Sequence, residues 1–347
     1  MPFDRDVPSP ITTGIDFAAD GAQHGFLNLP WSRDDSAWGA ILIPIAVIGR
    51  GTAPTILLTG GNHGDEYEGP IALFDLARTL DPAEITGRVI ILPALNYPAF
   101  RAGTRTSPID RGNLNRSFPG DPKGGPTAQI ADYLTRYLLP LADVVLDFHS
   151  GGRTLDFLPY AAFHELPDKE QEARALAAVA TFAAPWSMMM REIDAAGMLD
   201  TTAERLGKVF ITTELGGGGT ARVETVAIAR RGVRNLLRHA GILAGAPDPA
   251  PTRWLTMPSA ECFHIAEDEG LVEPCIALGE RVRAGAVIAR IHPIGRTGLA
   301  PSDQRAAIDG LLAARHVPGL VHPGDCHAVI ATEIAVPRRY GSATGAG

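Results

Sequence analysis

The strongest constraint on the fold is a regular alternation of short apolar runs with longer helical patterns in the first 245 residues. The apolar runs cover residues 41–48, 55–59, 89–94, 144–148 and 209–214, and Gly, Pro or charged residues bound each of them. Helical patterns lie between several of these runs, at residues 69–80, 128–139, 169–182 and 221–240. Strands that alternate with helices predict an α/β sheet covered by helices on both faces.

Two of the apolar runs, TILLT and VIILPAL, are hydrophobic at every position or nearly so, which is typical of central strands buried on both sides. The apolar stretch at residues 37–48 is shorter than the roughly 20 residues that a membrane-spanning helix needs. Because it contains Pro44, we predict a buried strand pair there and no membrane segment.

The pattern changes near residue 245, where the segment GAPDPAPT reads as a Pro/Ala linker. Beyond it, short strand-like pieces alternate with Gly and Pro turns and helical periodicity is nearly absent. We therefore expect a catalytic domain at residues 1–245, a smaller C-terminal all-β domain at 253–331 and a polar tail at 332–347.

Within the C-terminal domain, LGERVRAGAVIARIHP resembles one hairpin of a biotinyl/lipoyl-like barrel-sandwich domain. A carrier domain of that type needs a lysine for covalent attachment, and no lysine follows Lys208. We therefore expect a structural or active-site-covering domain rather than a carrier.

Charge and cysteine content exclude several classes of protein. The net charge is −8 and no block of Lys or Arg occurs, which argues against a nucleic-acid partner. The three cysteines are odd in number and lack CxxC spacing, so neither a disulfide framework nor a cysteine zinc site is indicated. The polar N-terminus has no apolar core of a signal peptide. We expect a cytoplasmic protein.

The first candidate site is GGNHGDE, where His63 and Glu66 follow a buried strand. An imidazole and a carboxylate three residues apart in a turn that enters a helix can face one point, and both bind zinc. His63 could instead be an ordinary turn histidine, and Glu66 an acid favoured at a helix N-terminus. The position at a strand end of an α/β sheet favours the ligand reading.

The second candidate is VVLDFHSGG, a buried strand that ends at His149. Asp147 lies two residues earlier and would share a face of the strand with it. Asp147 could orient a zinc-binding histidine, or it could be a core acid that caps a neighbouring helix. Both readings stay open.

The third candidate is Glu214 in TELGGGG, at the end of a β-branched strand. It is either a surface acid at a strand end or a buried catalytic base. The glycine run favours the base, because it allows backbone to pass close to another group there. A general base beside a zinc ion would promote hydrolysis.

The fourth candidate is the long polar segment at residues 101–120, which contains Arg105, Asn113, Asn115 and Arg116. An arginine fork beside an asparagine amide can hold a substrate carboxylate. An ordinary surface loop is the alternative, although loops of this length are often functional. Jointly, the four segments make the residue set of a carboxypeptidase-like zinc hydrolase, with three protein ligands and one open metal position.

This set resembles the succinylglutamate desuccinylase/aspartoacylase family, on the motifs GGNHGDE, NLNRSFPG, DFHSGG and TELGG in that order. The C-terminal β-domain also fits that family, so the resemblance covers almost the whole chain. The longer segments GGNHGDEYEGP, TRTSPIDRGNLNRSFPG and TELGGGGT are closer still to one branch, the N-acetyl-L-2,4-diaminobutyrate deacetylases of ectoine breakdown.

The resemblance implies a carboxypeptidase-like mixed sheet and one Zn²⁺ per chain, held by His63, Glu66 and His149. It further implies a catalytic acid–base at Glu214 and carboxylate binding by Asn115 and Arg116. Arg105 is similar to the family arginine that polarises the scissile carbonyl, although its spacing to NLNR is longer than in aspartoacylase. Asn113 replaces the Asp of DLNR versions, and we expect this change to matter little if Asn115 and Arg116 make the contact.

The expected function is hydrolysis of the amide of a small N-acyl amino acid, with N-acetyl-L-2,4-diaminobutyrate as the first candidate. The alternatives are another N-acyl amino acid, a carboxypeptidase that cleaves peptides, and a catalytically silent binding protein. A homodimer is expected only because homodimers are common. The sequence does not locate a pocket for a substrate's side-chain amine.

Overall fold

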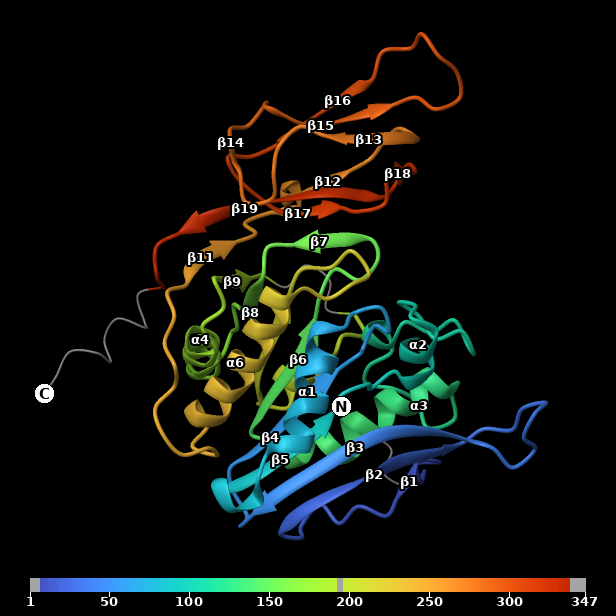
Figure 1. The fold of residues 1–347 in the computed structure, drawn as a ribbon, viewed down its shortest axis with the longest axis vertical. Coiled ribbons are helices and arrows are strands. Elements are labelled where there is room, and N and C mark those ends of the chain that lie inside the picture. The colour runs from blue at the N-terminus through green and yellow to red at the C-terminus, as the bar shows by residue number, and fades with distance from the viewer. Residues whose placement is uncertain (1–6, 192–195, 338–347) are drawn as a thin grey trace, which may run out of the picture.

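The computed structural model describes residues 7–191 and 196–337 of the chain. Its main element is a large mixed sheet that runs from the N-terminal strands to the C-terminal ones (Figure 1). The strand order is β1-β2-β3-β5-β4-β6-β10-β8-β9-β11-β19-β17-β14. Four strands in the middle of this order, β5 (Gly87–Leu92), β4 (Thr55–Gly60), β6 (Val144–His149) and β10 (Val209–Glu214), are parallel to one another. Their carboxyl ends therefore meet at one edge of the sheet.

The N-terminal edge of the sheet is antiparallel and consists of β1 (Thr12–Thr13), β2 (Gly21–Pro30) and β3 (Ala40–Arg50). The strand pair predicted at residues 37–48 is wrong, because β3 is a single strand that runs through Pro44. Proline is tolerated there since Pro44 lies opposite Phe26 of β2, whereas pairing with β5 on the other side begins only at Ala46. The missing N–H therefore costs no bond to β5.

Helices cover both faces of the sheet. On one face α1 (Glu68–Thr79), α4 (Lys169–Phe182) and α6 (Val223–His239) pack together over a core that includes Leu73, Val179 and Leu236 (Figure 1). On the other face α3 (Pro126–Tyr133), its π-helical continuation Leu134–Leu138, and α5 (Leu199–Arg205) pack over a second core. The two-sided covering explains why the middle strands are apolar at nearly every position.

The predicted strands and long helices occur close to their expected places. The pattern at 169–182 is α4 with the same bounds, and the pattern at 221–240 is α6. The sequence did not predict β2, the short helices α2 (Tyr97–Ala102) and α5, or the strands β7 (Leu155–Phe157), β8 (Tyr160–His164) and β9 (Trp186–Met190). These elements are short or only partly apolar, so their periodicity is weak.

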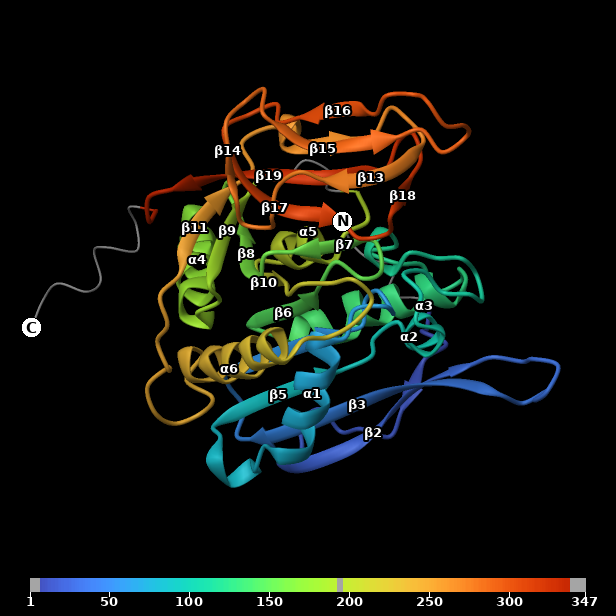
Figure 2. The same ribbon diagram turned by 45° about the horizontal axis from the view of Figure 1, so that its top comes forward.

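The segment after the linker forms β-strands in two groups (Figure 2). The strands β11 (Arg253–Thr256), β19 (Cys326–Ile334), β17 (Gly310–His316) and β14 (Arg281–Val282) extend the main sheet, and β12 (Phe263–Ile265) pairs with β19. A smaller antiparallel sheet contains β16 (Ser302–Arg305), β15 (Val287–His292), β13 (Gly270–Pro274) and β18 (Leu320–Val321). The mixed α/β fold with a smaller all-β part is as predicted.

The division into domains stays a prediction, because the main sheet continues across the linker through the parallel pair β9 and β11. Strand β19 also continues past Ala331 to Ile334, and most of the predicted tail lies outside the described residues. The single hairpin expected at LGERVRAGAVIARIHP is wrong, because β14 pairs with β17 while β15 pairs with β13 and β16. Among the described residues, no helix combines the length and the apolarity needed to cross a bilayer.

Candidate active site

The eight residues predicted for the site line one cavity, at the carboxyl edge of the parallel strands. They are His63, Glu66, Arg105, Asn115, Arg116, Asp147, His149 and Glu214. The other described residues that line it are Tyr160, Met190, Met198, Asp200, Phe210 and Thr212. The cavity is about 190 Å³, below the roughly 300–1,000 Å³ usual for drug-sized ligands, so it suits a small molecule better than a peptide.

The parallel pairing of β6 with β10 brings the strand-end residues together. In this register Glu214 lies opposite His149, and Thr212 lies opposite Asp147. On the other side of β6, strand β4 ends at Gly60 beside Phe148, and the following turn carries His63. The turn packs tightly, since a Cβ on Gly64 would lie 2.0 Å from the carbonyl carbon of Ala99. Only glycine fits at this position.

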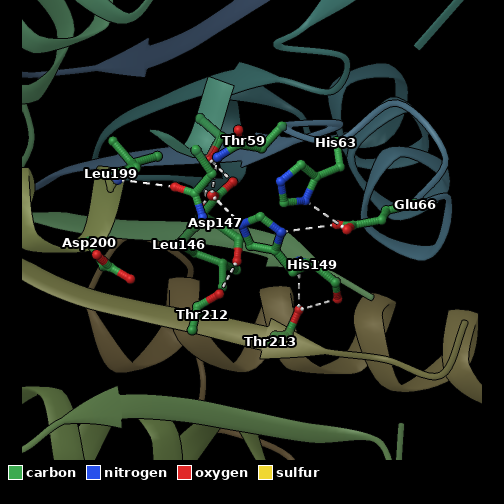
Figure 3. Close-up of polar contacts among 12 residues, drawn as sticks. Thr59, His63, Glu66, Leu146, Asp147, His149, Leu199, Asp200, Thr212 and Thr213 are labelled. Carbon is green, nitrogen blue, oxygen red and sulfur yellow. Dashed lines mark hydrogen bonds and ion pairs between the residues drawn. The ribbon is translucent and has the colours of Figure 1, made fainter. Parts of the chain in front are cut away.

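Glu66 contacts both histidine rings, as Figure 3 shows. Its Oε1 is 2.8 Å from Nδ1 of His63, and its Oε2 is 2.9 Å from Nδ1 of His149. The ligand atoms of the three residues all lie within 4.8 Å of one another, and all three side chains are largely buried. Two imidazoles and one carboxylate form the donor set of catalytic zinc sites, which leave a fourth position open. The group therefore fits a zinc ion.

Asp147 contacts the far nitrogen of His149. Its Oδ2 lies 2.8 Å from Nε2 of His149, and Thr59 and Asn62 donate further hydrogen bonds to the same carboxylate. Of the two readings left open by the sequence, this geometry matches the one in which Asp147 orients a ligand histidine. A carboxylate in this position fixes the imidazole tautomer and leaves Nδ1 available for a metal.

Asn113 has the corresponding contact with the other histidine, which the sequence analysis missed. Its Oδ1 lies 3.2 Å from Nε2 of His63 and also accepts a hydrogen bond from the backbone N–H of Asn115. The expectation that the Asp-to-Asn difference matters little overlooked this contact. An amide oxygen can accept from Nε2–H of His63 but carries no charge, so Asn113 would orient His63 without adding a negative charge.

Burial and neighbouring charged groups shift the pKa values of the two histidines and Glu66 in the metal-free protein. Burial opposes ionisation of Glu66, but the adjacent His63 and His149 hold its pKa well below the ordinary value. Burial alone would lower the pKa of His149, yet Asp147 and Glu66 raise it well above the usual range. The pKa of His63 is lowered, mainly by burial. The pair of acids around His149 thus provides the negative charge that a metal cation would neutralise.

Glu214 is buried at the end of β10 and faces the cavity, so it is not the surface acid of the alternative reading. Burial and the nearby Glu66 raise its pKa to about 8. Its Oε2 has no hydrogen-bond partner among the described residues. A carboxyl group with these properties can exchange a proton with a ligand in the cavity. Glu214 lines the same cavity as the candidate metal ligands, which argues against the alternative of a catalytically silent binding protein.

The glycine run after Glu214 passes close to the segment that follows His149. A Cβ on Gly217 would lie 2.0 Å from the carbonyl oxygen of Leu155, and all four glycines of the run have positive φ. The backbone of the glycine run therefore lies close to residues 151–157, which is the close approach predicted from the sequence. Strand β17 pairs with β7 in this segment.

Arg105 and Arg116 provide the cationic side of the cavity. Arg105 Nη1 is 3.3 Å from Nδ1 of His63 and 3.6 Å from Oε1 of Glu66. Arg116 follows Asn115 in a short turn and donates to the backbone oxygen of Asn115. The side-chain oxygen of Asn115 accepts the backbone N–H of Leu199, which leaves its amide N–H groups to face a ligand.

The strands after the linker contribute no lining residue, since every described residue that lines the cavity lies between His63 and Glu214. Strand β17 contacts the segment that follows His149, because it pairs with β7, and its Arg315 is 3.4 Å from Asp156 of β7, which also pairs with Arg222. The expectation of an active-site-covering domain therefore receives no support from the lining, and a structural role is favoured.

Comparisons with known proteins match either part of the chain or nearly its whole length. A model of the succinylglutamate desuccinylase/aspartoacylase catalytic domain matches residues 52–240. The N-alpha-acetyl-L-2,4-diaminobutyric acid deacetylase of Halomonas elongata is 56% identical over 327 residues, 93% of this chain and 95% of that protein. The product-bound structure of the ectoine utilization protein EutE from Ruegeria pomeroyi is 56% identical with a TM-score of 0.92, covering 94% of this chain and 100% of that one. A succinylglutamate desuccinylase structure from Silicibacter sp. is 54% identical, with the same TM-score and coverage.

Proposed function

The chain belongs to the succinylglutamate desuccinylase/aspartoacylase family of amide-cleaving hydrolases, and we propose that it is a zinc-dependent deacetylase of N-acetyl-L-2,4-diaminobutyrate. The products would be acetate and L-2,4-diaminobutyrate. The observation that carries the proposal is one small cavity that contains His63, Glu66 and His149 together with Glu214 and a cationic side. The names of the relatives from Halomonas elongata and Ruegeria pomeroyi support this substrate and a role in ectoine degradation.

One zinc ion per chain would be held by His63, Glu66 and His149, whose donor set suits it. When bound, zinc supplies Lewis acidity, which lowers the pKa of water and polarises a carbonyl oxygen. Asp147 holds the ring of His149 through Nε2, and Asn113 holds the ring of His63 in the same way. These two contacts keep both Nδ1 atoms directed at the same point.

Glu214 would act first as a base and then as an acid. It takes a proton from the water that attacks the amide carbon, and it gives a proton to the departing amine nitrogen. Its Oε2, which has no hydrogen-bond partner within the described part of the chain, and its buried position support this role. Arg105, half exposed and close to Glu66, would donate hydrogen bonds to the oxygen on which negative charge develops.

Asn115 and Arg116 would bind the α-carboxylate of the substrate. A guanidinium beside an amide gives two or more charge-assisted hydrogen bonds and a fixed orientation. With the carboxylate held there, the acyl group would lie toward Glu66 and Glu214, so the scissile amide would be presented to the base.

The decisive experiment measures acetate release from N-acetyl-L-2,4-diaminobutyrate by the purified protein, with and without a zinc chelator. We expect release that the chelator abolishes and that added Zn²⁺ restores. A panel with N-succinyl and N-formyl amino acids and short peptides identifies the acyl group. Preference for peptides would replace the proposal with a carboxypeptidase, and no turnover of any amide would favour a binding protein.

We propose a cytoplasmic homodimer, with 1–245 as the catalytic domain and 253–331 as a separate β-domain. Sedimentation analysis would test the dimer, and expression of residues 1–245 alone would test the domain division.

A further inference from the structure

Three residues on three neighbouring strands form one row across the face of the sheet that lines the cavity. His149 of β6 lies opposite Glu214 of β10, and Glu214 lies opposite Tyr160, the first residue of β8. Residues directly opposite each other on antiparallel strands, such as Glu214 and Tyr160, share a face and have Cβ atoms roughly 4.5–5.5 Å apart. All three residues line the cavity. Glu214 therefore has a candidate metal ligand on one side and a tyrosine on the other.

The carboxyl group of Glu214 needs a fixed orientation if it is to act as the base. One of its oxygens has to face the water that attacks the amide, and a base acts only from within hydrogen-bond reach of the proton it takes. Oε2 of Glu214 is buried and has no hydrogen-bond partner within the described part of the chain. A buried ionised carboxylate is costly unless a donor binds to it. We therefore looked for a donor beside Glu214.

Tyr160 carries a hydroxyl group next to this carboxyl group, and no motif of the sequence singled it out. Only 4% of its surface is exposed, and it is one of the residues that line the cavity. Burial, together with the charge of Glu214, raises the pKa of Tyr160 well above its ordinary value. The hydroxyl therefore keeps its proton through the neutral pH range and can donate it in a hydrogen bond.

The ring of Tyr160 packs among apolar residues, several of which belong to the strands after the linker. It makes an edge-on contact with Phe157 of β7, with the ring centroids 5.9 Å apart and the planes at 85°. The same core cluster contains Leu255 of β11 and Leu311 and Ala313 of β17. A ring packed in this way has little freedom to move. The strands after the linker thus support the site through Tyr160, although none of their described residues lines the cavity.

We propose that Tyr160 is a positioning residue for the base, an inference that rests on the proposed deacylase function. In the enzyme with metal and substrate bound, the Tyr160 hydroxyl donates a hydrogen bond to Oε2 of Glu214. The other oxygen, Oε1, is then directed at the attacking water, and Tyr160 keeps its own proton throughout. Because Oε2 has no partner in the metal-free protein, the Glu214 side chain has to rotate toward β8 to form this bond.

Two other roles of Tyr160 give different kinetic results. If only the packing of the ring matters, the hydroxyl is dispensable, and phenylalanine would replace Tyr160 without loss of activity. If the hydroxyl instead binds the substrate, its removal raises KM and leaves kcat nearly unchanged. Orientation of the base affects the chemical step, so its loss lowers kcat. The separate values of kcat and KM therefore distinguish the three roles.

The first test compares the zinc-loaded wild type with Tyr160→Phe, using N-acetyl-L-2,4-diaminobutyrate as the substrate. We expect kcat to fall about 10–100-fold, with KM changed less than about twofold. Elemental analysis should find the same zinc content in both proteins. The control is Tyr133→Phe, which removes the hydroxyl of another buried tyrosine, one that stacks on Tyr137 and does not line the cavity. It should behave as wild type.

The second test is a double-mutant cycle that identifies Glu214 as the partner of Tyr160. Glutamine at position 214 cannot accept a proton, so in Glu214→Gln the hydroxyl has no base to orient. Adding Tyr160→Phe to Glu214→Gln should therefore lower the residual kcat by less than about twofold. A hydroxyl that acts independently of Glu214 would cost the same factor in both backgrounds.

Wild-type kcat in Tyr160→Phe would overturn the inference, and so would a higher KM with an unchanged kcat. An equal loss of kcat in the wild-type and Glu214→Gln backgrounds would overturn it as well, and so would loss of zinc from Tyr160→Phe. Each of these results leaves the proposed function standing, because the wild type still hydrolyses the substrate. Absence of wild-type turnover of any N-acyl amino acid would overturn the proposed function itself.

Discussion

The carboxylate of Asp147 lies 2.8 Å from Nε2 of His149, while Glu66 contacts Nδ1 of the same ring. The imidazole is therefore held from both sides, and the two acids keep it directed into the cavity. Orientation of a ligand histidine by a carboxylate on its far nitrogen is a common feature of zinc sites.

Asp147→Asn should weaken zinc binding by about 10–100-fold, because the uncharged amide no longer fixes the ring and tautomer of His149. Zinc affinity is measured by competition with a chromophoric chelator. The control is Asp143→Asn, since Asp143 lies just before the same strand and its carboxylate accepts the backbone N–H of Thr55 without lining the cavity. Equal affinity in both variants and the wild type would contradict the role of Asp147.

His63→Ala should remove stoichiometric zinc, since two protein ligands hold a catalytic metal poorly. Elemental analysis after gel filtration measures the metal content. His164→Ala is the matched control, because His164 is also a buried histidine paired with a glutamate, Glu204, but outside the cavity. A His63→Ala protein that keeps one zinc per chain would show that the metal is held elsewhere.

Glu214→Gln should retain zinc but lower kcat by about 10²–10⁴-fold, because glutamine keeps the shape of the side chain and cannot accept the proton. The measurement combines metal analysis with acetate release. Glu224→Gln, at an exposed position in the first turn of α6, should behave as wild type. Wild-type turnover in Glu214→Gln would exclude Glu214 as the base.

Arg116→Ala should raise KM by about 10-fold or more while kcat changes little, because the contact that we propose for Arg116 is to the α-carboxylate and not to the reacting amide. Steady-state kinetics separate the two constants. Arg101→Ala is the control, since Arg101 is exposed on α2 and does not line the cavity. A fall in kcat with unchanged KM would place Arg116 in the chemical step instead.

His327, on β19, should make stability depend on pH in the acidic range. Burial, with the nearby His264 and His316, lowers its pKa to about 4, below the roughly 6.5 expected in the unfolded chain. Below pH 6.5 the unfolded chain binds a proton that the folded protein does not, so stability is fully present above pH 6.5 and falls as the pH approaches 4. The expected loss is roughly 2–3 kcal/mol.

Denaturant unfolding of the apo-protein at pH 7 and pH 5 measures this loss, and His327→Gln is the comparison. The variant should lose less stability between the two pH values than the wild type does. An identical loss in both proteins would assign the acid sensitivity to other groups.

The sequence alone determined the α/β class, the central strands and the identity of the metal-site candidates. The physical reason is that these features are local: apolar runs report strands buried on two faces, and a polar residue directly after such a run lies at a sheet edge. The helix at 169–182 shows this most directly, since its periodicity and its N-cap Asp168 define its bounds without any tertiary contact.

Only the tertiary structure decided the contacts between residues far apart in the chain. Asn113 looks like any loop amide in the sequence, and its role depends on lying 3.2 Å from His63. Asp200 looks like a surface acid at the start of a weak helix, and it enters the cavity because α5 packs against the sheet face beside β10. The pairing of β6 with β10 sets His149 opposite Glu214, and strand order is a property of the whole sheet that no single segment encodes.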